Sequence, residues 1–324
     1  MSRREDIKQI RAIACIAIVI LHTFRSFITS NMEGYAIACI IRDLMNFAVP
    51  CFLMVSGFLL LDKNREITIK KVWTKYIPSV LIPLIFCTVL FSVTDSLIKG
   101  TELTDVLKDS IVDLWTDGSW KHLWYVYMLI GIYILLPLYR KIAASSTNTE
   151  IMYLIGIWIV FLSIIPQTSL LGVKSGFYVC TYTVYPLFLF IGIAQGIKRP
   201  WLIFTISAFI TALSSYAAYG IGNETIQKMI STYTFLPVIF MATGFFHGWI
   251  GTNFSSKFFL ILSRIDDCGF GIYLYHVLFI RLLALVYRPV TIPAIFCTSL
   301  LILCISWAFV FIVKKTPVLK HVCC

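Results

Sequence analysis

Apolar stretches of roughly 20 residues recur along the whole chain, and they constrain its fold more than any other feature. A helix of this length crosses the hydrocarbon core of a bilayer. Only 13% of the residues are charged, whereas soluble domains carry about 25%. The sequence therefore predicts an all-α, polytopic integral membrane protein with a single domain over residues 1–324. About ten transmembrane helices are expected, at residues 10–30, 44–61, 76–98, 122–139, 151–171, 177–197, 201–219, 231–249, 268–287 and 293–313.

The basic residues predict the orientation of these spans. The formal net charge is +11, which in a soluble protein would suggest nucleic-acid binding. In a polytopic membrane protein, Lys and Arg instead gather in the cytoplasmic loops. An even number of spans puts both termini on one side, and placing both in the cytoplasm puts about two thirds of the 27 Lys and Arg residues there. We expect that orientation in a bacterial plasma membrane, with the lipid bilayer rather than nucleic acid as partner.

Cysteine usage predicts neither a metal site nor a resident cofactor. Most of the ten cysteines lie inside apolar runs, where they serve as small packing residues, as at Cys15, Cys51, Cys87, Cys180, Cys297 and Cys304. No CxxC pair or Cys/His metal spacing is present in the sequence.

The first predicted span carries polar side chains along one face. At roughly 100° per residue, Arg11 and His22 point in nearly the same direction, with Cys15 and Arg25 close beside them. Charged groups within a span are costly and usually face a cavity or a partner, so we expect this stripe to face the protein interior. The opposite face is expected to meet lipid, through Ile13, Ala17, Ile20, Phe24 and Phe27.

Along the helix axis, Arg11 and His22 are separated by roughly 16 Å. Arg11 is therefore expected near the cytoplasmic surface, where it could bind an anion, and His22 beyond the middle of the membrane. A purely structural alternative has Arg11 and Arg25 extending to the two interfaces while His22 bonds a backbone carbonyl.

The ninth span carries a second histidine, His276, deep in its apolar run, with Tyr273 one turn earlier. His276 is either a functional residue or a buried histidine with a purely structural role. Gly269 and Gly271 are expected to let a neighbouring helix approach closely.

The fourth span opens with His122 and Trp124, which are candidates for substrate contact. An aromatic belt at the membrane interface is the alternative, because Trp120, Tyr125 and Tyr127 adjoin them.

Three further features sit at span ends. Lys70, Lys71 and Lys75 would either anchor a helix to anionic lipid or bind the phosphates of a nucleotide-like donor. Arg42 is a candidate substrate contact, or one half of a simple ion pair with Asp43. Ser56 and the glycine directly after it indicate a point of close helix packing.

Taken in order, five motifs resemble the membrane acyltransferase-3 family over essentially the whole chain. Arg11 followed after ten residues by His22 is similar to the family's signature on its first helix. The others are "VPCFLMVSGFLL" (49–60), "KKVWTKYIP" (70–78), "HLWYVYMLIGIYILLP" (122–137) and "FGIYLYH" (270–276). The size resembles the standalone branch that O-acetylates cell-surface glycans such as enterobacterial common antigen. One position departs: many members carry Asp three residues before the signature arginine, where this chain has Lys8.

The resemblance implies transfer of an acetyl group from cytoplasmic acetyl-CoA to a hydroxyl of an extracytoplasmic glycan or glycolipid. His22 is the candidate base or transient acyl carrier, with Arg11 and His276 as the other catalytic candidates. Basic residues suit the phosphates of coenzyme A, and the candidates are Arg11, Lys70, Lys71 and Lys75. The candidate acceptor contacts are Arg25, Arg42, His122, Trp124 and Tyr273. An oxyanion could be stabilised by Arg25, Tyr273 or His276.

Other function classes remain open at this point. A secondary transporter or glycolipid flippase would use the same arginine and histidine to bind or relay, although the first span has no counterpart near the sixth, as an internal repeat would require. A polytopic glycosyltransferase would need an outer acid, for which Glu33 and Asp43 are available. The paired motif of the unrelated His/Asn membrane acyltransferases is not found.

Overall fold

Helices make up all the regular structure in the described part of the chain. The structure is a computed structural model, and it describes residues 4–100, 106–116, 118, 120–173, 175–177, 183–252, 257–316 and 322. Eight of the described helices are long and apolar enough to cross a membrane, by length and composition. This confirms the predicted all-α, polytopic architecture.

The long helices are often built from consecutive segments. They are α1 (Glu5–Phe27), α2 (Tyr35–Leu44) with η1 (Met45–Phe47) and α3 (Ala48–Leu60), α4 (Ile69–Lys71) with the π-helical η2 (Val72–Tyr76) and α5 (Ile77–Lys99), η4 (Lys121–Leu123) with α7 (Trp124–Ser145), α8 (Asn148–Ile159) with η5 (Val160–Ile164), α9 (Ile165–Gln167) and η6 (Thr168–Leu171), α11 (Pro200–Ile221), α14 (Lys257–Ala284) and α15 (Ile292–Lys315). The shorter helices are α6 (Val106–Thr116), α10 (Tyr185–Ile191), α12 (Glu224–Ile230) and α13 (Leu236–Trp249).

Prolines and glycines set many of the helix ends. Pro200 and Pro293 lie in the first turns of α11 and α15, where a missing N–H costs nothing. Gly100 and Gly222 follow the last turns of α5 and α11 with φ of +67° and +72°, a left-handed backbone that glycine adopts without strain.

Two predicted spans take a different form from the expected 20-residue helices. The span predicted at 231–249 is a helix only from Leu236, because Pro237 sits in its first turn. The span predicted at 177–197 contains only the seven-residue α10, and residues 178–182 lie outside the described part. Asn148 and Gln195 exchange hydrogen bonds of 3.0 and 3.4 Å, so the chain after α10 returns to the end of the molecule where α8 begins.

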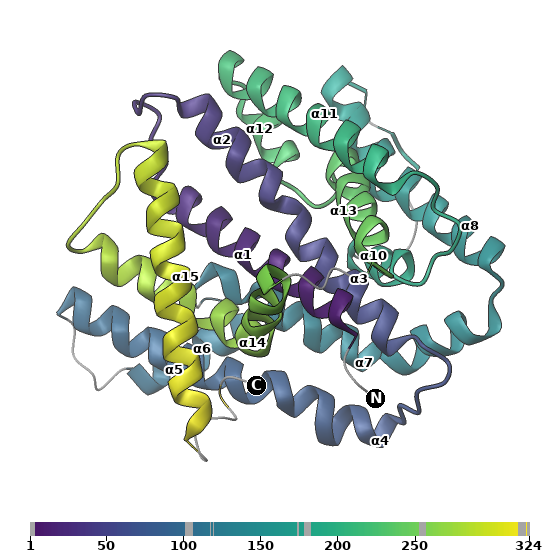
Figure 1. Cartoon of the computed structure of the whole chain (residues 1–324), viewed down its shortest axis with the longest axis horizontal. Coiled ribbons are helices and arrows are strands. Elements are labelled where there is room, and N and C mark those ends of the chain that lie inside the picture. Colours follow the sequence, from purple (N-terminus) through teal and green to yellow (C-terminus); the bar gives the residue numbers. More distant parts are fainter. Residues whose placement is uncertain are drawn as a thin grey trace.

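The first helix runs through the middle of the molecule, with α15 on one side and α11 and α13 on the other (Figure 1). Within its apolar stretch 67% of the residues are buried, against 17% in the helix Asn148–Leu170. The prediction that one face of α1 meets lipid is therefore wrong. Ala17 and Phe24 on that face are 3% and 0% exposed, because α2, α3, α14 and α15 surround the helix.

Glycines mark the tightest helix contact. A Cβ on Gly57 in α3 would lie 2.0 Å from the carbonyl oxygen of Leu189 in α10, and one on Gly192 would lie 2.1 Å from that of Met54. The close packing predicted at Ser56 and its glycine is thus confirmed. In α14, Gly271 packs against Val310 of α15 as predicted, but a Cβ on Gly269 would meet nothing within 4 Å, so the expectation for that residue is wrong.

We predict that Gly57→Ala destabilises the protein by about 1–3 kcal/mol, because the added methyl group overlaps backbone atoms that cannot rotate away. Thermal unfolding of the purified protein in detergent measures the loss. Gly131→Ala in α7 is the matched control, since its Cβ would meet open space. An unchanged melting temperature for Gly57→Ala would show that α3 and α10 are not in the described contact.

Candidate active site

Three histidines from distant parts of the sequence meet beside α1. His22 lies on α1, His122 in η4 and His276 on α14. The ring centroids are 5.0 Å apart for His22 and His276, 5.6 Å for His122 and His276, and 6.3 Å for His22 and His122. The sequence predicted a site role for each of them, and the structure brings all three together.

The hydrogen bonds of His276 leave one ring nitrogen with a lone pair. The side chain is fully buried, and its Nδ1 lies 3.0 Å from the carbonyl oxygen of Ile272 and 2.7 Å from that of Tyr273. Carbonyl oxygens only accept hydrogen bonds, so Nδ1 carries the proton in the neutral ring. Nε2 is then an acceptor, and within the described residues it has no partner. This nitrogen is available to a neighbouring donor.

His122 is held in a similar way with its nitrogens reversed. Its Nε2 lies 3.0 Å from the carbonyl oxygen of Leu274 and donates to it, while the buried Nδ1 has no partner in the described part of the chain. The Tyr273 hydroxyl donates to the backbone carbonyl of His122. One turn of α14 thus fixes both the ring and the backbone of His122, and the neutral ring presents a second lone pair.

A wide cavity of about 1040 Å³ reaches from the amino-terminal end of α1 toward the histidines. Among the described residues, its charged lining consists of four cations, Arg4, Arg11, Arg65 and Lys314, and three carboxylates, Asp62, Asp266 and Asp267. Its apolar and aromatic wall includes Ile18, Val49, Phe52, Val55, Tyr125, Tyr133 and Tyr273. Ile18 precedes His22 by four residues, which is about one turn of α1. The cavity is therefore charged at one end and apolar near the histidines.

A second, smaller cavity of about 490 Å³ lies at the other end of α1. It is lined by His22, Arg25, Lys121, His122, Trp124 and Val277. His22 and His122 therefore line this cavity, while Ile18, one turn before His22, lines the wide one. The histidine cluster lies between two spaces of different character.

At the amino-terminal end of α1, Arg11 forms a two-pronged ion pair with Asp266 of α14. Arg11 Nε and Nη2 donate to the two carboxylate oxygens of Asp266 at 2.6 and 2.5 Å. The Asp266 side chain is 2% exposed and that of Arg11 27%. Arg11 was predicted as an anion-binding residue, and the structure shows it already partly neutralised while still lining the wide cavity. The sequence analysis did not identify an acid as the partner of Arg11.

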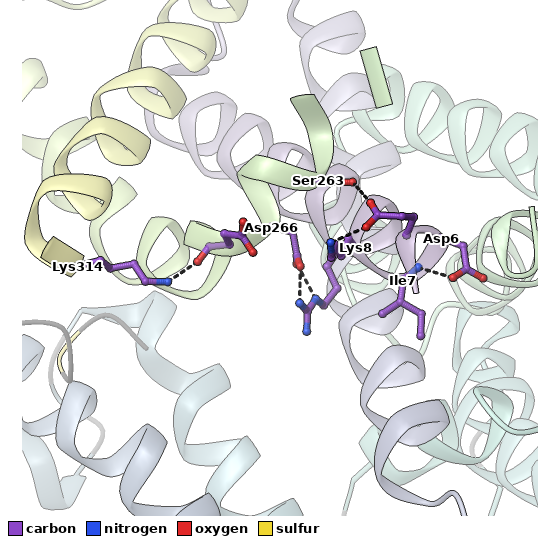
Figure 2. Close-up of polar contacts among 9 residues, drawn as sticks. Asp6, Ile7, Lys8, Ser263, Asp266 and Lys314 are labelled. Carbon is purple, nitrogen blue, oxygen red and sulfur yellow. Dashed lines mark hydrogen bonds and ion pairs between the residues drawn. The ribbon is translucent and has the colours of Figure 1, made fainter. Parts of the chain in front are cut away.

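Other polar contacts attach the same end of α1 to α14 (Figure 2). Lys8, which replaces the family's usual Asp, donates to Glu5 at 2.5 Å, and Ser263 of α14 donates to the same carboxylate at 2.7 Å. Within α1 itself, Asp6 accepts from the backbone N–H of Ile7 at 2.9 Å. The carboxylate beside Arg11 is thus supplied by α14 rather than by position 8.

Several predicted site residues lie outside this arrangement. Lys70 and Lys75 are exposed, Lys71 donates to the carbonyl oxygen of Glu66 at 3.2 Å, and none of the three lines either cavity. At the wide cavity Arg4, Arg65 and Lys314 supply positive charge instead, and the sequence analysis missed them. Of these residues, only Arg65 lies near the predicted lysines in the sequence, five residues before Lys70.

Arg42 also lies outside the two cavities. Its guanidinium pairs with the fully buried Asp43 at 2.8 Å, and Ser215 donates to the same carboxylate at 2.9 Å. Arg42 also donates to the hydroxyl of Tyr219. The ion-pair alternative for Arg42 is therefore the one that the structure supports.

The aromatic belt expected around His122 is instead an internal cluster. Trp120 stacks on Phe91 with ring centroids 4.1 Å apart, and Tyr125 is buried. Arg281 lies over the Trp120 ring at 4.8 Å and pairs with Asp95 at 2.8 Å. Neither Asp95 nor Arg281 was singled out in the sequence, although both are charged residues within predicted spans.

Metal binding was considered because three histidines meet here. Within the described ranges, no group of three or more His, Cys, Asp or Glu side chains is placed to hold a metal ion. The unpartnered ring nitrogens of His122 and His276 are instead disposed to accept protons or hydrogen bonds.

Comparison with known proteins assigns a family. Residues 4–311 match the family model described as an acyltransferase domain. The chain is 23% identical over 298 residues to proteins named "Probable poly-beta-1,6-N-acetyl-D-glucosamine export protein" from Staphylococcus aureus strains MRSA252 and MSSA476. These alignments cover 84% of this chain and 81% of each relative. No solved structure matches the chain significantly.

We predict that Asp266→Asn lowers the free energy of unfolding by about 2 kcal/mol, because it leaves the Arg11 guanidinium without a carboxylate in a mostly buried setting. The measurement is thermal unfolding in detergent. Glu224→Gln breaks the exposed ion pair with Lys228 and should change stability by less than about 0.5 kcal/mol. Equal losses of stability for the two substitutions would show that the ion pair between Arg11 and Asp266 does not stabilise the packing of α1 against α14.

Proposed function

The chain belongs to this acyltransferase family, and we propose that it is a membrane O-acetyltransferase of a cell-envelope glycan or glycolipid. The donor is acetyl-CoA on the cytoplasmic side of a bacterial plasma membrane, where both chain termini lie. The acceptor hydroxyl is on the outer side. The observation that carries the proposal is the cluster of His22, His122 and His276 between two cavities of different character.

The wide cavity suits the donor. Coenzyme A has several phosphate charges at one end and a long, weakly polar arm that ends in the thioester. Arg4, Arg65 and Lys314 line this cavity and would bind the phosphates through charge-assisted hydrogen bonds. Arg4 would do so beside Asp6, with which it pairs at 2.5 Å, and Lys314 also donates to the carbonyl oxygen of Asp267 at 2.5 Å. The arm would then follow the apolar wall past Ile18 and deliver the thioester to His22. In this proposal Arg4, Arg65 and Lys314 bind the phosphates of coenzyme A, the role that the sequence predicted for Lys70, Lys71 and Lys75.

Arg11 has a mainly structural part in this proposal. Its guanidinium holds Asp266 with two donors and so sets the position of α14. Part of the group still faces the cavity, where it adds positive charge beside the path of the donor.

His22 acts as the base. Its ring faces the small cavity, so it can take the proton from the acceptor hydroxyl as the oxygen attacks the thioester carbonyl carbon. The new C–O ester bond forms, the C–S bond breaks, and the sulfur leaves with the electron pair of that bond. The imidazolium of His22 returns the proton to the departing thiolate. The His276 ring adjoins that of His22, and its Nε2 lone pair can stabilise the imidazolium.

The contacts of Tyr273 and His276 remove both residues from the list of candidate oxyanion donors. The Tyr273 hydroxyl is engaged with the carbonyl of His122, and neutral His276 presents a lone pair toward the cluster rather than a proton. We therefore assign both to positioning His122 and His22. Arg25 lines the small cavity, where the acceptor would bind, and is the oxyanion donor that remains.

Glycan export is the second candidate function, and the printed name of the Staphylococcus aureus relatives favours it. An exporter would move a glycan past the same histidines without forming an ester. Acyl transfer and glycan movement can be measured separately in proteoliposomes, by ester formation and by arrival of intact glycan on the far side.

We predict that His22→Gln lowers acetyl transfer at least about 100-fold, because glutamine cannot take a proton at neutral pH. The measurement is transfer of labelled acetyl from acetyl-CoA to glycan by purified protein in liposomes. Thermal unfolding should show that the variant is folded, and Lys228→Gln in α12 should keep full activity as an exposed control. Full activity of folded His22→Gln would falsify the assigned role.

A further inference from the structure

We propose that the acceptor is an anionic glycan, with a carboxylate or phosphate close to the hydroxyl that is acylated, and that Arg25 and Lys121 recognise this acidic group. The inference rests on the proposed function and specifies its acceptor. It is drawn from the charges and aromatic rings around the small cavity.

The lining of the small cavity is cationic. Arg25 and Lys121 both line it, and no carboxylate of the described residues does. Neither side chain has an ion-pair partner in the part of the chain that the structure describes. Two positive charges beside the catalytic histidines therefore face the space where the acceptor would bind. Such a site attracts an anion and repels a cation.

Acids elsewhere around the histidines are already engaged. Asp43 pairs with Arg42 and accepts from Ser215. Asp95 pairs with Arg281 at 2.8 Å and accepts from the indole N–H of Trp120 at 3.2 Å. These pairings leave Arg25 and Lys121 with charge to offer to a ligand.

Trp124 in the lining of the small cavity favours an anion that is part of a sugar. Trp124 lines the small cavity, and its ring lies 5.4 Å from Tyr185 and 5.7 Å from Tyr233, tilted by 33° and 31°. The faces of such rings pack well against the apolar face of a pyranose, while the phenol and indole edges stay polar. The volume of about 490 Å³ falls within the range of small-molecule sites, roughly 300–1,000 Å³. The cavity thus offers the ring of Trp124 and the two cations Arg25 and Lys121 to a single sugar unit.

The two cations should affect anionic and neutral acceptors differently. A carboxylate or phosphate would accept charge-assisted hydrogen bonds from the Arg25 guanidinium and the Lys121 ammonium. A neutral sugar would keep only the stacking and the hydrogen bonds of its hydroxyls. The advantage of the anion should shrink as salt screens the partly exposed charges.

The test uses the full-length protein in phosphatidylcholine liposomes with acetyl-CoA as donor. Three oligosaccharides of equal length serve as acceptors: a neutral N-acetylglucosamine oligomer, one with a uronic-acid carboxylate and one with a phosphate monoester. We expect kcat/KM to be about tenfold higher for at least one anionic acceptor, and the advantage to fall in 0.5 M salt. The better of the two anionic acceptors identifies the acid.

Substitutions separate this role from a structural one. Lys121→Gln should lower kcat/KM about tenfold for the anionic acceptor while leaving the neutral one within about twofold. Arg288→Gln is the control, because Arg288 is an exposed cation that lines neither cavity. Equal kcat/KM for neutral and anionic acceptors in the wild type would overturn the inference, as would an equal loss for both in Lys121→Gln.

Binding of the same oligosaccharides, followed by quenching of tryptophan fluorescence, tests the inference without acyl transfer. Preferential binding of the anionic oligomer, lost in Lys121→Gln, would support the site even if no ester formed, and the proposed function alone would then fail. Ester formation with no charge preference in binding or turnover would instead leave the proposed function standing and overturn the inference.

Discussion

The packing of α1 against α14 is the constraint on which the candidate site depends. Arg11 pairs with Asp266 near one end of the two helices, and the rings of His22 and His276 lie side by side near the other. The two positions are eleven residues apart on α1 and ten apart on α14, which is about three turns on each. The helices therefore run parallel and in register. Any shift that broke the ion pair would also separate the histidines.

This arrangement accounts for polar groups at the centre of an apolar molecule. Burying charge is costly, and the cost is offset only where a partner with good geometry is present. Arg11 and Asp266 meet through two short hydrogen bonds, and the buried histidines donate to backbone carbonyls of α14. Among the described residues, one nitrogen on each of His122 and His276 has no hydrogen-bond partner, and the cations Arg25 and Lys121 at the small cavity have no ion-pair partner. The two nitrogens can interact with His22 or a substrate, and the two cations can interact with the acceptor.

The sequence was sufficient to predict the polar stripe of α1, the position of His276 within an apolar helix and the all-helical fold. It could not tell which surface the apolar side of α1 meets, because lipid chains and neighbouring helices are equally apolar. Ala17 and Phe24 were consequently assigned to lipid although they are buried. Contacts between distant segments could not be predicted either. Nothing in a single sequence shows that Asp266 contacts Arg11, or that Arg4, Arg65 and Lys314 line one cavity. The Lys70, Lys71 and Lys75 cluster was conspicuous in the sequence but lies away from both cavities.

In the proposed mechanism, an acyl group passes from one side of the membrane to the other through the histidine cluster. The most direct measurement seals acetyl-labelled acetyl-CoA inside vesicles of uniform orientation and supplies the glycan only outside. The account predicts ester-linked label on the outer glycan while coenzyme A stays inside, in vesicles whose cytoplasmic face is inward. Label that reaches the glycan only when both substrates share one side, or unlabelled glycan that crosses the membrane, would contradict it.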